Sequence, residues 1–514
     1  MHADLSRDTF RPERSYSAVL AQQGRVQLDA DANEQAAIQL HLARTTTADL
    51  VGQHGGPRGA TGFEVGFLGG SRELDDLSLG GGRYYVDGIL LDATRPEPGV
   101  PAEDAGDDAE TPATWTYWDQ PDGYRDPERP GDRLPTQFPY LVRLKVWERS
   151  VTAAEDPSLR EVALGPAMPD TAARVRTVWQ VLPLPGSQLE LEDGATKDQV
   201  REAFARWAAA QEPTARMAAR SERPEHADED PCLVDPEARY RGPENQMYRV
   251  EIHEGGPAEE ATFKWSRENG SVTLPVEGTD GTWVELASLG NDDELGLNVG
   301  DQVEFVDTGY TSRGEPLPLL RIEEIDLPGR RVRLSDEPHP SVGRSPGLHP
   351  FLRRWDQRPG SRHRGATGRT KQTAGKPLGG ALRIEEGGWL PLEDGVFVYF
   401  EPGRTYRSGD YWTVPARTAT GGVEWPTDAA RRPLLQSPKG IGVHHAPLAW
   451  VLGEGSVVDL RMTFAPLAAV IPAADERALA AEAEAEAEAE AKAAETGGSE
   501  GRKAGQDDEG QPEN

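Results

Sequence analysis

The stretch Tyr140-Leu-Val-Arg-Leu-Lys-Val-Trp-Glu-Arg-Ser-Val151 decides the fold class, because its apolar and charged side chains alternate. A period of two residues predicts a strand with one buried face. Residues 174–181 repeat this pattern. Residues 81–91 hold two apolar runs separated by Asp87-Gly88, and this dipeptide between such runs predicts a β-hairpin.

Further short strands are predicted along the rest of the chain, at residues 247–253, 261–265, 396–400, 411–414 and 448–452. Residues 298–334 alternate over short runs with tight turns, which favours a small SH3-like barrel of five strands. The 56 glycines and 42 prolines also favour many short strands over long helices. We therefore predict a mainly β, multidomain protein, in which an N-terminal helix precedes short-strand β-sandwich and small-barrel domains.

A chain of 514 residues is too long for one ordinary core, so two to four domains are expected. Residues 1–55 form an N-terminal segment with a helix, and 56–185 a β domain with a long acidic loop at 95–135. Residues 186–240 are predicted to be a charged linker or insertion with a helix at 197–216. Residues 241–470 form a β-rich region with the barrel at about 298–335, and 471–514 an acidic, low-complexity Ala/Glu tail, frayed or disordered.

Acidic residues outnumber basic ones by 87 to 55, a formal charge of −32. Such a chain is repelled by nucleic-acid phosphates and by anionic membrane surfaces. No apolar run is long enough to predict membrane insertion, and the first 20 residues lack the pattern of a secretory signal, so synthesis in the cytoplasm is expected. The lone Cys232 excludes a disulfide framework.

No sequence motif for catalysis is present: HExxH, CxxC, GxSxG and Walker A patterns are all lacking. We predict that the protein is not an enzyme and uses no cofactor or metal. His444-His445 would point to opposite faces of a strand, which favours a structural role over a metal site. The alternative is a carbohydrate-binding or carbohydrate-active protein, in which aromatic residues of the acidic loop stack on sugars. These residues, which we expect instead to pin the loop onto its own domain, are Trp115, Tyr117, Trp118 and Tyr124, beside Asp119, Asp122 and Asp126.

The N-terminal segment reads Tyr16-Ser-Ala-Val-Leu-Ala-Gln-Gln-Gly-Arg-Val-Gln-Leu-Asp-Ala-Asp-Ala-Asn-Glu34. Gly24 allows a tight turn, and Asp31 with Glu34 fits a capping box at the start of a helix that runs to about Leu50. Ile38 and Leu42 form a thin apolar stripe on this helix. A helix with so little apolar surface needs a partner, either elsewhere in this chain or on a neighbouring subunit.

This segment, with Ser6-Arg-Asp-Thr-Phe10 before it, resembles the opening of a large uncharacterised bacterial family. The resemblance extends over about residues 4–455, through the blocks at 160–164, 177–180, 263–270, 409–417 and 442–448. The resemblance implies that genes of this family are often neighbours of genes for phage-tail-like contractile injection systems. Phage tail-fibre proteins open with a similar sequence pattern, and in those proteins this segment anchors the fibre and helps it to trimerise. This chain departs from those relatives that append a β-helix, and it has Ala32 where some have Trp.

The resemblance implies a structural or accessory component of such a particle, associated with its baseplate or tail fibre. Its partners would be protein subunits of the particle and further copies of itself, as a trimer, and it could leave the cell within a released particle. Other possibilities in such a system are a chaperone or a cargo effector. The residues expected to dock are Gln23, Gly24, Arg25, Asp29, Asp31, Asn33, Glu34, Ile38 and Leu42. Replacing Ile38 and Leu42 with Asp is expected to abolish assembly and to leave the β domains folded.

Overall fold

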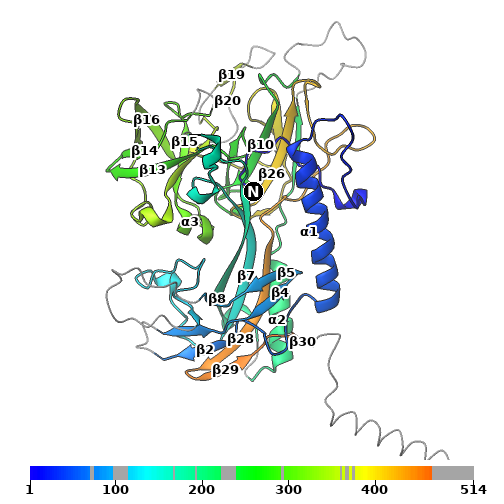
Figure 1. The fold of residues 1–514 in the computed structure, drawn as a ribbon, viewed down its shortest axis with the longest axis vertical. Coiled ribbons are helices and arrows are strands. Elements are labelled where there is room, and N and C mark those ends of the chain that lie inside the picture. Colours follow the sequence, from blue (N-terminus) through cyan, green and yellow to red (C-terminus); the bar gives the residue numbers. More distant parts are fainter. Residues whose placement is uncertain are drawn as a thin grey trace, which may run out of the picture. The chain divides into compact units, whose positions relative to one another are not determined.

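Strands dominate the computed structural model, which confirms the mainly β class with an N-terminal helix (Figure 1). The structure describes residues 1–69, 75–96, 114–165, 168–191, 194–221, 239–290, 295–358, 362–364, 370–372 and 377–465. Met1–Thr463 forms one unit and Phe464–Asn514 a second. Cys232 and the predicted acidic tail lie outside the described residues.

The first sandwich is built on the alternating strand predicted at residues 140–151. That strand, β7 (Tyr140–Val151), pairs along its whole length with β8 (Arg174–Pro185). On its other side lie β28 (Val443–Gly453) and then β29 (Ser456–Asp459). The first β region is therefore not confined to residues 56–185, because a strand from near residue 450 completes its sheet. Pairing between strands 300 residues apart leaves no local signal in a sequence.

Two smaller sheets cover one face of this four-stranded sheet. One contains, as neighbours in this order, β1 (His54–Pro57), β4 (Arg83–Val86) and β5 (Ile89–Asp92), and the other has the order β2 (Val65–Leu68), β3 (Asp76–Leu79), β6 (Trp115–Thr116). Alternate residues of β7, such as Val142 and Leu144, pack against Leu79 and Tyr84 across the interface. The predicted hairpin is confirmed, since Asp87 and Gly88 have positive φ angles and connect β4 to β5.

Helix α2 (Lys197–Ala210) covers the opposite face of the same sheet. Thr196 and Gln199 form a capping box at its start, and Val200 and Phe204 pack on Leu141 and other residues of the sheet. Of the segment predicted as a charged linker or insertion, α2 therefore packs on the first sandwich and Met217–Ser221 forms a strand of the second, and the helix ends at Ala210 where residue 216 is predicted. Its apolar stripe is short and lies among charges, so the sequence alone does not reveal what it covers.

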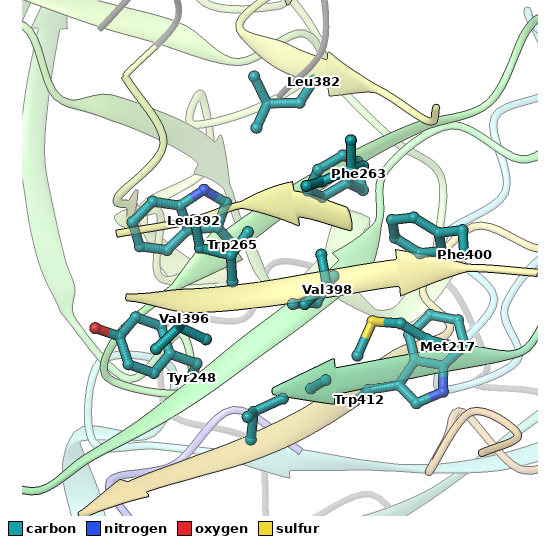
Figure 2. Packing of buried hydrophobic residues seen from close by; sticks show 14 of the residues in the cluster. Met217, Tyr248, Phe263, Trp265, Leu382, Leu392, Val396, Val398, Phe400 and Trp412 are labelled. Carbon is teal, nitrogen blue, oxygen red and sulfur yellow. The ribbon is translucent and has the colours of Figure 1, made fainter. Parts of the chain in front are cut away.

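The second sandwich packs a six-stranded sheet against a three-stranded one. The larger sheet has the order β21 (Pro377–Leu378), β22 (Ala381–Arg383), β12 (Thr262–Ser266), β10 (Gln246–Ile252), β26 (Tyr411–Arg417), β27 (Gly422–Val423). The smaller has β23 (Trp389–Pro391), β24 (Val396–Phe400), β9 (Met217–Ser221). Figure 2 shows Phe263, Phe400 and Trp412 meeting in this core, where Phe400 lies edge-on to Trp412. Each such ring contributes about 1.5–3 kcal/mol by leaving water.

The strands after β12 in the sequence form a closed barrel, which is larger than predicted. Its strands, in order around the barrel, are β13 (Thr273–Asp280), β14 (Trp283–Leu286), β17 (Arg331–Leu334), β16 (Leu320–Asp326), β15 (Gln302–Val306) and β18 (Phe351–Trp355). The predicted window of five strands at 298–335 is wrong in extent, because β13, β14 and β18 lie outside it. The barrel closes only where β13 pairs with β18.

The remaining elements are short, apart from α1 (Asp29–Val51). They comprise α3 (Thr308–Arg313), the pairs β11 (Gly256–Pro257) with β25 (Thr405–Tyr406) and β19 (Arg362–Arg364) with β20 (Thr370–Gln372), β30 (Thr463–Phe464), and the 3-10 turns Pro12–Arg14, Pro130–Asp132, Pro157–Leu159, Val162–Leu164, Gly186–Gln188 and Pro346–Leu348.

Candidate functional site

The N-terminal arm, which we define as residues 15–28, is the most exposed apolar segment of the described chain. Its side chains Leu20 and Val26 are each 83% exposed, Tyr16 is 58% exposed and Leu28 50%. Scattered single apolar side chains are normal on a protein surface, but four within 13 residues of one segment are not. Exposure on this scale is typical of a surface that another protein covers.

The backbone of the arm is also largely unpaired. It has no regular secondary structure on either side of a turn in which Arg25 N–H donates to the carbonyl of Gln22, and Gly24 has a φ of +70°. Within residues 16–27, the only other hydrogen bond of the backbone runs from Val19 N–H to the side-chain oxygen of Gln35, at 2.7 Å. An extended segment with free donors and acceptors can add to the edge of a sheet in a partner. The predicted turn at Gly24 is confirmed.

The base of the arm is fixed on helix α1 by the residues that precede it. Ser6 donates from its backbone and hydroxyl to Asp29, and Thr9 donates to Glu34. The ring of Phe10 packs on His41 with centroids 5.7 Å apart. Residues 6–10 therefore lie along α1, and we call them the strap.

The predicted capping box is wrong. Helix α1 begins at Asp29, two residues before Asp31, and Leu28 occupies the N-cap position without a side-chain cap. Asp29 and Glu34 bind the strap instead of the helix backbone, so contacts distant in sequence replace the local ones. Asp31 and Asn33 are exposed in the first turns of the helix.

Helix α1 is in turn attached to the first sandwich. Arg44 donates through both guanidinium nitrogens to the carboxylate of Glu148 on β7. Ile38 is 1% exposed, whereas Leu42 is 49% exposed. The two residues therefore do not form one docking face: Ile38 packs within this chain, and Leu42 remains on the surface with Gln23, Gly24 and Arg25.

The strap also contacts the second sandwich. Arg417 donates to the carbonyl of Ser6 at 2.7 Å, Arg7 pairs with Glu424 at 3.3 Å, and Lys439 pairs with Asp8. None of these three partners is among the predicted site residues. Arg417 does lie in the block 409–417 that carries part of the family resemblance, and that block is the one signal that could have found it.

A second concentration of polar side chains is buried between the second sandwich, the barrel and residues 1–3. Glu251 accepts from Arg249 at 2.6 Å and contacts the imidazole of His2 at 2.9 Å, while Lys264 bridges Glu251 at 3.3 Å and Glu304 at 3.0 Å. Burial would raise the pKa of Glu251, but Arg249, Lys264 and His2 hold that pKa well below its usual range. Each of these carboxylates has cationic partners. The arrangement is therefore that of a structural ion cluster, which we call the buried ion cluster.

A family model described as a family of unknown function (DUF6519) matches residues 1–225 and 194–504. The chain belongs to this family. The predicted membership of an uncharacterised family is therefore confirmed, while the model assigns no function to its members. No curated protein and no solved structure matches the chain.

Elsewhere in this family member, the residues considered for chemistry have structural partners. His444 and His445 point to opposite faces of β28, one to Asp87 at 2.7 Å and the other to Trp207 of α2. Among the described residues, no group of three His, Cys, Asp or Glu side chains could hold a metal ion. No described helix is both long enough and apolar enough to cross a membrane.

The aromatic residues of the acidic loop are engaged by their own domain. Tyr117 is buried and donates to the carbonyl of Asp132, and Trp118 donates to the carbonyl of Asp75. The guanidinium of Arg95 lies 4.3 Å from the ring centroid of Trp115 and also pairs with Asp119. These contacts support the interpretation that the aromatic residues pin the loop.

Proposed function

We propose that this protein is a non-catalytic structural subunit of a phage-tail-like contractile injection particle, associated with its baseplate or fibre. The observation that carries the proposal is the N-terminal arm, an apolar segment with unpaired backbone that is held at its base by the strap. In this proposal the arm docks on neighbouring protein subunits, including further copies of this chain in a trimer.

The way in which the arm is held supports docking over random exposure. The strap binds both α1 and the second sandwich, so the base of the arm is positioned before a partner arrives. A segment that is already ordered loses less conformational entropy on binding than a disordered one, which favours affinity. The two sandwiches and the barrel would then present surface to the rest of the particle.

The test is recovery of the protein with sheathed particles sedimented from a native lysate. Wild type should sediment at a fixed ratio to the sheath protein, whereas Leu20→Ser/Val26→Ser should stay in the soluble fraction. The matched control is Val299→Ser/Leu327→Ser, which changes two exposed apolar residues of the barrel. Thermal midpoints of the purified variants should equal that of wild type, since none of the four side chains is buried.

If the arm variant sediments with the particles like wild type, the arm does not dock the protein. Wild type found only in the soluble fraction would contradict the whole proposal and leave a chaperone, a cargo or a sugar-binding protein.

A further inference from the structure

Two cations on β7, Arg143 and Lys145, have no carboxylate partner among the described residues. They lie two residues apart and therefore on the same face of the strand, which is the face that α2 covers. The buried cations elsewhere in the described chain are paired: Arg149 with Glu155, Arg313 with Asp132, and Lys264 with Glu304. Arg143 and Lys145 thus lack the carboxylate partners that these buried cations have, although the protein has a formal charge of −32.

The groups closest to the pair are basic side chains, and none of them neutralises the two cations. His445 is the cross-strand neighbour of Lys145, and its Nδ1 lies 3.2 Å from a guanidinium nitrogen of Arg143. Arg125 and Arg407 act on Lys145 from nearby segments, but each already pairs with an aspartate, Asp132 and Asp410 respectively.

Among the groups that act most strongly on Lys145, Glu315 is the acidic one. Its carboxylate is already bound by Arg129 at 2.9 Å and by Arg313 at 2.8 Å. It is therefore not available to neutralise Lys145 and Arg143 as well.

Burial and the close approach of the cations lower three pKa values in this group. Burial and the neighbouring arginines lower the pKa of Lys145 to about 8, and burial lowers that of Arg143 to about 10. Burial, Arg143 and Lys145 lower the pKa of His445 to about 3, so its ring is neutral and accepts from Arg143. Like charges at close range disfavour their charged forms, and a bound anion reverses this effect.

The two cations are also held in place and within reach of solvent. The guanidinium of Arg143 lies over the ring of Trp207 at 4.8 Å, and the ammonium of Lys145 lies over Trp147 at 4.6 Å. Both side chains are half-buried. His445 also lines a cavity of about 230 Å³ beside Phe204 and Ala208 of α2. His445 is the member of the cluster that borders this cavity, whose lining also includes Arg201 and Glu202.

We propose that Arg143, Lys145 and His445 form a binding site for a small oxyanion, a phosphate or a carboxylate. Lys145 supplies a point charge, Arg143 a planar donor group, and the two tryptophans orient the cations. The site shares no residue with the N-terminal arm and does not depend on the function proposed above.

The test is the thermal midpoint of the purified full chain in phosphate or citrate, compared with sodium chloride at equal ionic strength. We expect 10 mM of one of the two oxyanions to raise the midpoint of wild type by a few degrees. Lys145→Met should abolish the rise and Lys145→Arg should keep it. Lys197→Met, which removes an exposed lysine at the start of α2, should behave as wild type.

A rise with phosphate alone would identify a phosphate-bearing ligand, and a rise with citrate alone a carboxylate. An unchanged wild-type midpoint in both anions would overturn the proposal. So would a rise that persists in Lys145→Met, because the anion would then bind elsewhere. If Lys145→Met unfolds before its midpoint can be measured, two other measurements decide. They are the thermal midpoint of Lys145→Gln in the two anions and direct calorimetric titration of wild type with phosphate.

Discussion

Gly88 lies where the β4–β5 turn meets helix α1. Its φ is +78°, and a Cβ at this position would come within 2.2 Å of the carbonyl oxygen of Arg44. Gly88→Ala is therefore expected to destabilise the fold by more than about 2 kcal/mol, since backbone strain and displacement of the helix add together. Thermal unfolding measures the loss. Gly59→Ala is the control, because Gly59 has a φ of +85° with open space around it, and its loss should stay near 1 kcal/mol.

Equal losses in the two glycine variants would mean that α1 is not seated against the turn. The sequence predicts the turn, since Asp-Gly between apolar runs is a local signal. It does not predict the approach of Arg44, because that contact joins two elements across a distance in the chain.

His253 follows β10 and is almost fully buried beside Lys264. Burial and this lysine lower the pKa of His253 to about 4, so the folded protein binds fewer protons than the unfolded chain between pH 4 and the usual histidine pKa of about 6.5. Stability is therefore expected to fall as pH falls through this window, by at most about 3 kcal/mol from this residue. In His253→Gln, the midpoint should drop less between pH 7.5 and pH 5 than in wild type. An identical drop would show that other groups carry the acid sensitivity.

At the scale of the element, helix α1 carries one apolar residue expected to stabilise the fold, Ile38, and one expected to be available for docking, Leu42. Ile38→Ala is expected to cost about 2–4 kcal/mol, because the side chain is buried, whereas Leu42→Ala should change stability by no more than about 0.5 kcal/mol. Urea unfolding followed by circular dichroism measures both. Replacing both residues with Asp would confuse the two effects, so Leu42→Asp is the variant that tests docking alone. A large loss in Leu42→Ala would place Leu42 in an internal contact.

Some features of helix α1 can be predicted from its sequence, and others cannot. Ala-rich content and Gly52 predict its existence and its end within a residue or two, since propensity and termination are local properties. The helix begins two residues before the predicted capping residue Asp31. The sequence did not indicate this start, because Asp29 and Glu34 bind Ser6 and Thr9 of the strap. For the arm, the sequence predicts the turn at Gly24, but only the structure shows that Leu20 and Val26 are exposed. The anion site is likewise invisible in the sequence, where Arg143 and Lys145 look like ordinary solvent-facing residues of an alternating strand.

At the scale of the whole molecule, the buried ion cluster joins segments that are far apart in the chain. Residues 1–3, β10, β12, β15 and β18 all contribute, and Asn269 Nδ2 donates to the carbonyls of Met1 and Ala3. Strand alternation in β10 indicates that Arg249 and Glu251 share a face, but it does not indicate what lies opposite. The cluster consequently escaped prediction, although β10, β12 and β15 were predicted as strands and, of its strands, only β18 was not.

Removing one charge from this cluster should weaken the connection between the second sandwich and the barrel. In Glu251→Gln, Arg249 and Lys264 lose a buried partner, and uncompensated buried charge costs about 3–5 kcal/mol. Chemical unfolding followed by tryptophan fluorescence should then separate an early transition of the barrel from a later one of the sandwiches. Glu323→Gln, in an exposed pair with Arg321, is the control and should cost no more than about 1 kcal/mol. If Glu251→Gln unfolds like the control, burial of apolar surface alone connects the two parts, and the ion cluster contributes no stability.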